Sequence, residues 1–149
     1  MTFEALIGAL SRTLGVEIED AGGAAAVEID GTVVVLQDAG EMLLMRAEIG
    51  EFPQEGKEAL LRSAMEANFL YQGTGGATLA VNPADGHLHI QKYNWLERLD
   101  ANMAFDMLER FADTIAAWRK VLADFRPVAE TAAAQEESTG FAGGPFLKV

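Results

Sequence analysis

The sequence has 149 residues, 50% of them hydrophobic, with a formal net charge of −12 and no cysteine. The length fits one domain, and the absence of cysteine excludes disulfides and thiolate metal sites. The acidic charge disfavours binding to nucleic acid or to anionic membranes, because both need clustered Lys and Arg. There is no run of about 18 apolar residues and no signal-peptide pattern at the N-terminus. We therefore expect a cytoplasmic protein without membrane insertion.

The charge is unevenly distributed along the chain. Residues 1–60 hold 12 acidic and 3 basic residues, whereas the remainder holds 11 acidic and 8 basic ones. An acidic N-terminal half would attract a basic partner. A solvated acidic face that keeps the protein soluble is the alternative explanation.

The first predicted element is a helix over residues 2–14. Its apolar residues recur at helical spacing and form one stripe, made of Phe3, Leu6, Ile7, Leu10 and Leu14. Thr2 is a suitable N-cap, and Gly15 ends the helix.

Three strands are predicted next, over residues 24–29, 32–37 and 42–49. Asp30-Gly31 between the first two predicts a tight hairpin, since both residues tolerate positive φ. The second and third strands carry consecutive apolar residues, so both of their faces need cover. A chain this short has too few helices to cover both faces, and we expect an exposed apolar patch, which usually marks an interaction site. A loop, the C-terminal tail or a dimer partner would be alternative cover.

A second helix is predicted over residues 54–71, followed by strands over 77–81 and 87–93. Between helix and strand, Gly73 and Gly75-Gly76 predict a helix stop and a sharp turn. A phosphate-binding loop has the opposite order, in which the glycines follow a strand and precede a helix. Nucleotide binding is therefore disfavoured.

A third, long helix is predicted over residues 101–125, with Asp100 as its N-cap. Its apolar residues alternate spacings of four and three, a heptad-like seam, and are Ala104, Leu108, Phe111, Ile115, Trp118, Leu122 and Phe125. Pro127 follows the helix. We expect a domain over residues 1–126 and a flexible C-terminal tail over 127–149, which is rich in Ala, Gly, Glu, Ser and Thr.

No catalytic motif is found. There is no nucleophile elbow, no zinc-protease motif and no calcium loop, and the carboxylates are scattered. His87 and His89 lie two apart and share one face of their strand, but no third ligand lies nearby with metal-site spacing. We expect a protein that is not an enzyme and that has no metal and no cofactor.

The order α-β-β-β-α-β-β-α, with hairpins and no βαβ crossover, predicts an α+β fold in which helices pack on an antiparallel sheet. Two motifs carry a family resemblance. Asn68-Phe69-Leu70 followed by Gly73-Thr74-Gly75-Gly76-Ala77-Thr78-Leu79 resembles the signature of the type III secretion chaperones of the Tir chaperone (CesT-like) family. The resemblance covers residues 2 to about 125 in element order and length.

The resemblance implies a cytoplasmic homodimer that holds the N-terminal segment of a secreted effector in an export-competent state without ATP. It implies a dimer interface at the second helix and the strand after the glycines, here Leu61, Met65, Leu79 and Val81. The effector would bind the first helix and the three-stranded region, for which we predict Phe3, Val33, Val35, Leu43 and Met45. The alternatives are a regulatory adaptor of the same fold that binds a folded signalling protein, and an enzyme with a deep polar pocket.

Overall fold

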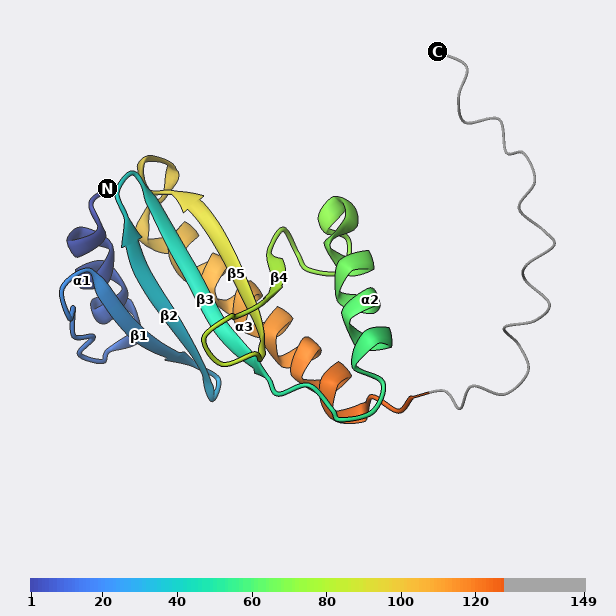
Figure 1. Cartoon of the computed structure of the whole chain (residues 1–149). Coiled ribbons are helices and arrows are strands. Elements are labelled where there is room, and N and C mark those ends of the chain that lie inside the picture. The colour runs from blue at the N-terminus through green and yellow to red at the C-terminus, as the bar shows by residue number, and fades with distance from the viewer. Residues whose placement is uncertain (128–149) are drawn as a thin grey trace, which may run out of the picture.

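A computed structural model describes residues 1–127 of the chain (Figure 1). Its elements follow the predicted order and are α1 (Phe3–Leu14), β1 (Ala24–Ile29), β2 (Thr32–Ala39), β3 (Met42–Gly50), α2 (Lys57–Asn68), β4 (Thr78–Val81), β5 (Leu88–Trp95) and α3 (Ala101–Asp124). Short 3-10 turns, η1 (Phe69–Tyr71) and η2 (Leu96–Arg98), follow α2 and β5. The predicted tail lies outside the described residues except for Pro127. The α+β class is confirmed.

The five strands form one antiparallel sheet in the order β1-β2-β3-β5-β4. The register of the first hairpin follows from its turn, because Asp30 (φ 48°) and Gly31 (φ 76°) both adopt positive φ. That geometry matches a two-residue turn that suits the twist of the strands, and it pairs Ile29 with Thr32. β1 and β4 are the two edges of the sheet.

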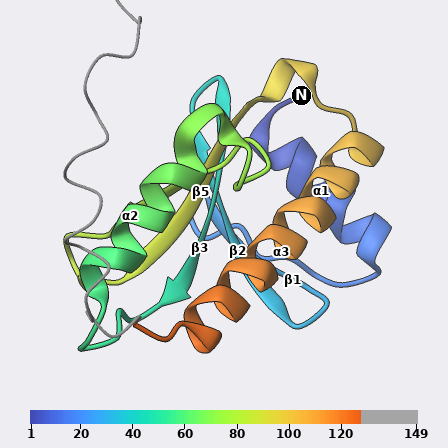
Figure 2. The ribbon, with the colours of Figure 1, turned by 90° about the vertical axis from the view of Figure 1, so that its right-hand side faces the viewer.

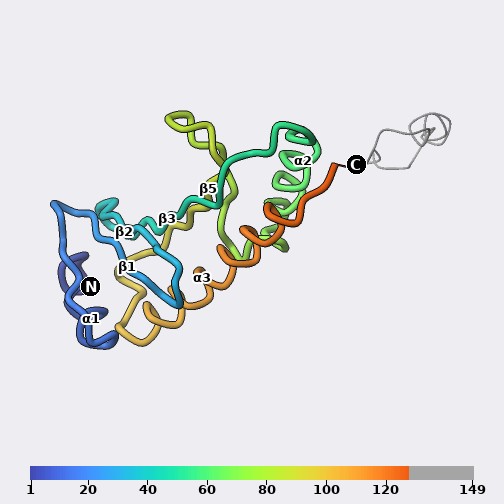
Figure 3. The backbone as a smooth tube through the Cα atoms, turned by 90° about the horizontal axis from the view of Figure 1, so that it is seen from below, coloured from blue at the N-terminus to red at the C-terminus, as the bar shows by residue number. Residues whose placement is uncertain are grey.

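Helices α1 and α3 lie on the same side of the sheet, as the view from below shows (Figure 3). The predicted cap of α1 is present, since the Thr2 hydroxyl accepts a hydrogen bond from the Ala5 N–H and Gly15 ends the helix at φ 67°. On α3, the predicted seam faces the core: Ala104, Leu108, Phe111, Ile115 and Trp118 are buried. The seam therefore packs across the sheet.

Helix α2 lies at the β4 end of the sheet, away from α1, as two perpendicular views agree (Figures 1 and 2). It begins at Lys57, because Gly56 holds a left-handed backbone (φ 79°) before it. It ends at Asn68, whereas the sequence predicted an end at Tyr71. The residues that then adopt positive φ are Leu70 and Tyr71 (53° and 55°). The prediction that Gly73 provides the left-handed stop is thus wrong.

Gly73 is required for a different reason. A Cβ atom at this position would lie 2.7 Å from the Cβ of Ala67, closer than two carbon atoms can pack. The glycine segment is also tied to the rest of the fold, because the Trp118 indole N–H donates to the Gly73 carbonyl (2.8 Å) and the Lys92 ammonium donates to the Gly75 carbonyl (2.9 Å). The segment therefore fixes α2 against α3 and β5.

Candidate functional site

The sheet face opposite α1 and α3 is not covered by any helix of residues 1–127 (Figure 3). It presents a group of apolar side chains, here called the open face: Val33, Val35, Met42, Leu44, Tyr93 and Trp95. Across β3 and β5 the group is continuous, because Met42 pairs with Trp95 and Leu44 with Tyr93, whereas Val35 on β2 pairs with Arg46. Val33, Tyr93 and Trp95 are 48%, 50% and 42% exposed. This is the exposed apolar patch that the strand pattern predicted, and such patches usually mark interaction sites.

A groove of about 310 Å³ borders the open face. The turn between β4 and β5 forms one wall of the groove, with Pro83, and the sheet forms its floor, with Leu44 and Arg46. An apolar side chain of a partner fits such a floor, and the Arg46 guanidinium provides a donor for a carbonyl or carboxylate.

The structure separates the five residues predicted to bind an effector. Val33 and Val35 lie on the open face. Phe3, Leu43 and Met45 lie on the opposite side, in the core beneath the helices, with exposed fractions of 4%, 1% and 0%. Successive residues of a strand point to opposite faces, so the run of apolar residues in β3 belongs to both faces. The open face also contains Met42, Leu44, Tyr93 and Trp95, which the prediction missed. Of these, Tyr93 and Trp95 could have been found from the sequence, because they are two aromatic residues at strand spacing.

One edge of the sheet is free. β1 is an edge strand, and within residues 1–127 its one backbone hydrogen bond beyond the sheet runs from the Ala21 N–H to the Ala24 carbonyl. A groove of about 400 Å³ follows this edge and is lined by small side chains, Ala24, Ala25 and Ala26, together with Val35. Unpaired backbone groups along an edge are a template for another strand.

The other edge is closed by a side chain. The Asn68 amide lies against β4, where its nitrogen donates to the Leu79 carbonyl (3.0 Å) and its oxygen accepts from the Leu79 N–H (2.8 Å). These are the two bonds that a neighbouring strand would make at this residue. A strand can therefore be added to β1 but is blocked at Leu79 of β4.

A second exposed apolar group lies on α2 and η1, here called the α2 patch: Met65, Phe69, Leu70 and Tyr71. Met65, Phe69 and Leu70 are 74%, 71% and 68% exposed. The residues predicted for a dimer interface divide here, since Met65 and Val81 are exposed, Leu61 is half-buried and Leu79 is buried at 5%. Phe69, Leu70 and Tyr71 are not among the residues predicted for the interface.

The two histidines lie beside carboxylates that the sequence did not place near them. His87 Nδ1 pairs with Glu48 Oε1 from β3, and His89 Nε2 pairs with Asp85 Oδ2 at 2.8 Å. The hydrogen bond to Glu48 raises the pKa of His87 above its ordinary value. The backbone N–H of His87 donates to Asp85 and lowers the pKa of that carboxyl. Glu48 is 39 residues from His87 in the chain, so spacing in the sequence could not reveal this cluster.

A profile of the Tir chaperone protein (CesT) family matches residues 5–119 of the 149. The chain belongs to this family. The match confirms the resemblance to type III secretion chaperones that the Asn68 and glycine motifs indicated. A search of curated protein sequences gave no significant match.

Solved structures of the same fold include chaperones in complexes. The structure of the HopA1-SchA chaperone-effector complex has a chain 20% identical to this one, with a TM-score of 0.61 and coverage of 83% of this chain and 94% of that chain. The ExsC-ExsE complex gives 16% identity, a TM-score of 0.67 and coverage of 82% and 97%. The Yersinia pestis type III secretion chaperone SycH, in complex with a stable fragment of YscM2, gives 21% identity and a TM-score of 0.58, with coverage of 78% of this chain and 99% of that chain. At these identities the likeness is evidence of a shared fold.

None of the helices within residues 1–127 is both long and apolar enough to cross a membrane.

Proposed function

We propose that this CesT-family chain is a chaperone that binds the N-terminal segment of a type III secretion effector as a homodimer in the cytoplasm, without ATP and without catalysis. The observation that carries the proposal is the open face beside the free β1 edge, an apolar surface next to unpaired backbone groups. The complexes formed by the structural relatives support it, because HopA1-SchA is a chaperone-effector complex.

The effector segment adds to the sheet along β1. An extended chain there forms backbone hydrogen bonds, and its alternate side chains reach the sheet surface. β1 pairs Ala26 with Val35 and Glu28 with Val33, so the small Ala26 side chain leaves room for a large client side chain to contact Val35. Apolar contact over the open face offsets the entropy lost when a disordered segment becomes ordered.

The charge of the chain favours a basic client. Residues 1–60, which include β1 and its edge, hold 12 acidic and 3 basic residues. An excess of acidic side chains raises the rate of encounter with a basic segment and makes that rate sensitive to salt. Binding of this kind needs no nucleotide. The glycines of residues 73–76 follow a helix and precede a strand, which is the opposite of the order in a phosphate-binding loop.

The homodimer forms through the α2 patch. Met65, Phe69 and Leu70 expose apolar surface at the β4 end of the sheet, far from the β1 edge. Because the two surfaces are separate, a dimer formed through α2 leaves both β1 edges accessible to a client.

The test is co-purification from the native cytoplasm, with intact-complex mass spectrometry and limited proteolysis. We expect two copies of the chain with one effector whose N-terminal segment is protected from the protease. Val35→Asp places a carboxylate in the apolar contact and is expected to weaken binding by at least about tenfold, because burying an unpaired charge costs more than about 1.4 kcal/mol.

Val121→Asp is the matched control. Val121 is exposed to 43% on α3, away from the β1 edge, so this variant should bind as the wild type does. Circular dichroism checks that both variants are folded. A client that stays bound to folded Val35→Asp, or a folded signalling protein held without a protected N-terminal segment, would refute the proposed binding mode.

A further inference from the structure

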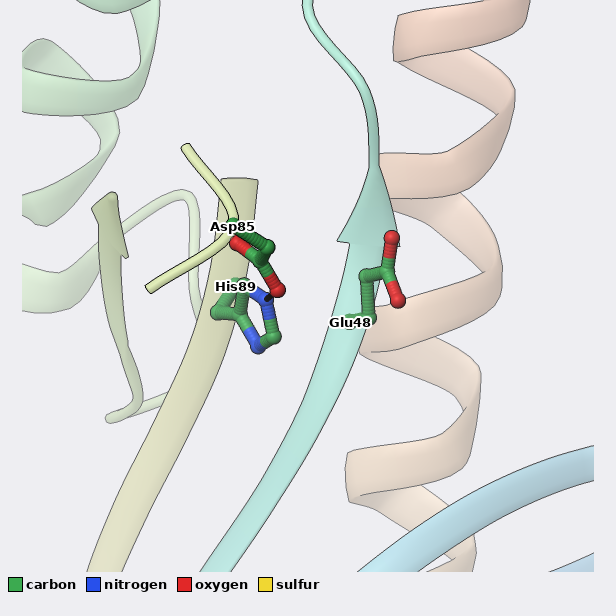
Figure 4. Close-up of side chains that lie close together, drawn as sticks. All are labelled: Glu48, Asp85 and His89. Carbon is green, nitrogen blue, oxygen red and sulfur yellow. Dashed lines mark hydrogen bonds and ion pairs between the residues drawn. The ribbon is translucent and has the colours of Figure 1, made fainter. Parts of the chain in front are cut away.

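Three potential metal ligands from separate parts of the chain meet at the end of the sheet near the β4–β5 turn. Glu48 comes from β3, Asp85 from the turn and His89 from β5 (Figure 4). One ligand atom from each residue lies within 4.8 Å of those of the other two. Glu48 and His89 are direct partners in the β3–β5 register, so the backbone of the sheet holds them side by side.

Asp85 is brought to this position by a structured turn. Its Oδ1 accepts from the His87 N–H at 2.8 Å and its Oδ2 lies 2.8 Å from His89 Nε2. The His89 side chain is only 20% exposed, so its imidazole has limited freedom to turn away. Two of the three ligands are therefore already positioned.

The donor set fits a divalent transition metal such as Zn²⁺. Zinc is bound by imidazole nitrogen and carboxylate oxygen, and nitrogen ligands favour it over Mg²⁺ and Ca²⁺, which prefer oxygen only. Zinc bonds of about 2.0–2.2 Å place tetrahedral ligand atoms roughly 3.3–3.6 Å apart. The exposed Glu48 side chain has room to rotate toward the other two ligands, and this rotation would replace its contact with His87 Nδ1.

The location makes the cluster simple to test. The chain has two histidines and no cysteine, so strong nitrogen or sulfur ligands for zinc exist only at His87 and His89. His87 contacts Glu48 through its Nδ1, so the His87 imidazole lies next to the cluster of Glu48, Asp85 and His89. Any zinc binding that depends on imidazole must therefore involve His87 or His89.

We propose that Glu48, Asp85 and His89 form a surface site for Zn²⁺ or a similar divalent transition metal, which bridges β3, β5 and the turn between β4 and β5. The bound ion would fix this turn against β3 at the border of the open face. The ordinary alternative is that the same residues only form two ion pairs, Glu48 with His87 and Asp85 with His89.

Isothermal titration of the untagged full-length protein with ZnCl₂ distinguishes the two. A polyhistidine tag must be absent because it binds zinc itself. We expect one Zn²⁺ per chain, with a dissociation constant in the micromolar range because the ligands are partly exposed, and no comparable binding of MgCl₂. Replacement of zinc by Co²⁺ should give the visible absorption of a low-coordinate cobalt site.

The variants His89→Asn and Asp85→Asn should each lower zinc affinity by at least about tenfold, the scale on which metal sites respond to loss of a group that supports them. Glu4→Gln is the control, since Glu4 is an exposed carboxylate on α1, on the opposite side of the sheet, and should leave affinity unchanged. Circular dichroism confirms folding.

No saturable binding near one ion per chain, or equal affinity in wild type, His89→Asn and Asp85→Asn, would overturn the proposal. A lower melting temperature for His89→Asn combined with unchanged zinc affinity would show that the residues are ion pairs only, and would overturn it as well. These outcomes are independent of effector binding.

Discussion

The closure of the β4 edge by Asn68 predicts a measurable loss of stability when its amide is removed. In Asn68→Ala, the Leu79 N–H and carbonyl lose partners at 2.8 and 3.0 Å in a part-buried position. An unpaired buried polar group costs about 1–3 kcal/mol, and partial access to water reduces this for both groups. We expect the free energy of unfolding to fall by about 2 kcal/mol.

Urea denaturation followed by circular dichroism measures this change. The melting temperature should fall by roughly 6–8 °C, because the unfolding entropy is about 2.1 cal/mol/K per residue. Chain concentration must be constant, because the proposed dimerisation would make apparent stability depend on it. Asn102→Ala is the control, since Asn102 is exposed on α3 and should change stability by less than about 0.5 kcal/mol. Equal stability of Asn68→Ala and the control would refute the view that this amide secures the edge.

Two further predictions concern the α2 region. Gly73→Ala should lower the free energy of unfolding by about 1–3 kcal/mol, because the new methyl group overlaps Ala67. The control Gly8→Ala, within α1 and with its nearest neighbour at 3.5 Å, should be neutral or stabilising by up to about 1 kcal/mol. Thermal melting compares the two variants, and a Gly73→Ala variant as stable as the wild type would contradict the close approach. Met65→Asp should produce a folded monomer in analytical ultracentrifugation, while Val121→Asp stays dimeric; a dimeric Met65→Asp would show that the subunits meet elsewhere.

The elements of the fold were predictable because each has a local cause. The Asp30-Gly31 turn sets the first hairpin, and the spacing of four and three along α3 sets its buried seam. The boundary of α2 was not predictable, because Leu70 and Tyr71 hold a backbone conformation that is uncommon for bulky residues. Glycines lay close by in the sequence, and their presence favoured the wrong position for the stop.

The candidate site was predictable only in part. The consecutive apolar residues of β2 and β3 indicate that both sheet faces carry apolar side chains, but they do not show which face the helices cover. That choice depends on where α1 and α3 pack, which is a tertiary property. Val33 and Val35 therefore fall on the open face while Leu43 and Met45 fall in the core, although all four have the same character in the sequence.

The strained end of α2 links the fold to assembly. Residues in sparsely populated backbone regions cost about 1–3 kcal/mol each, and Leu70 and Tyr71 both adopt such a conformation. The subunit regains little of this cost by burial, because the two side chains are 68% and 55% exposed. Burial of a side chain the size of Leu or Phe stabilises by about 1.5–3 kcal/mol, which is enough to offset the strain if a second subunit covers the α2 patch. The strain therefore supports the proposal that the α2 patch is a dimer interface.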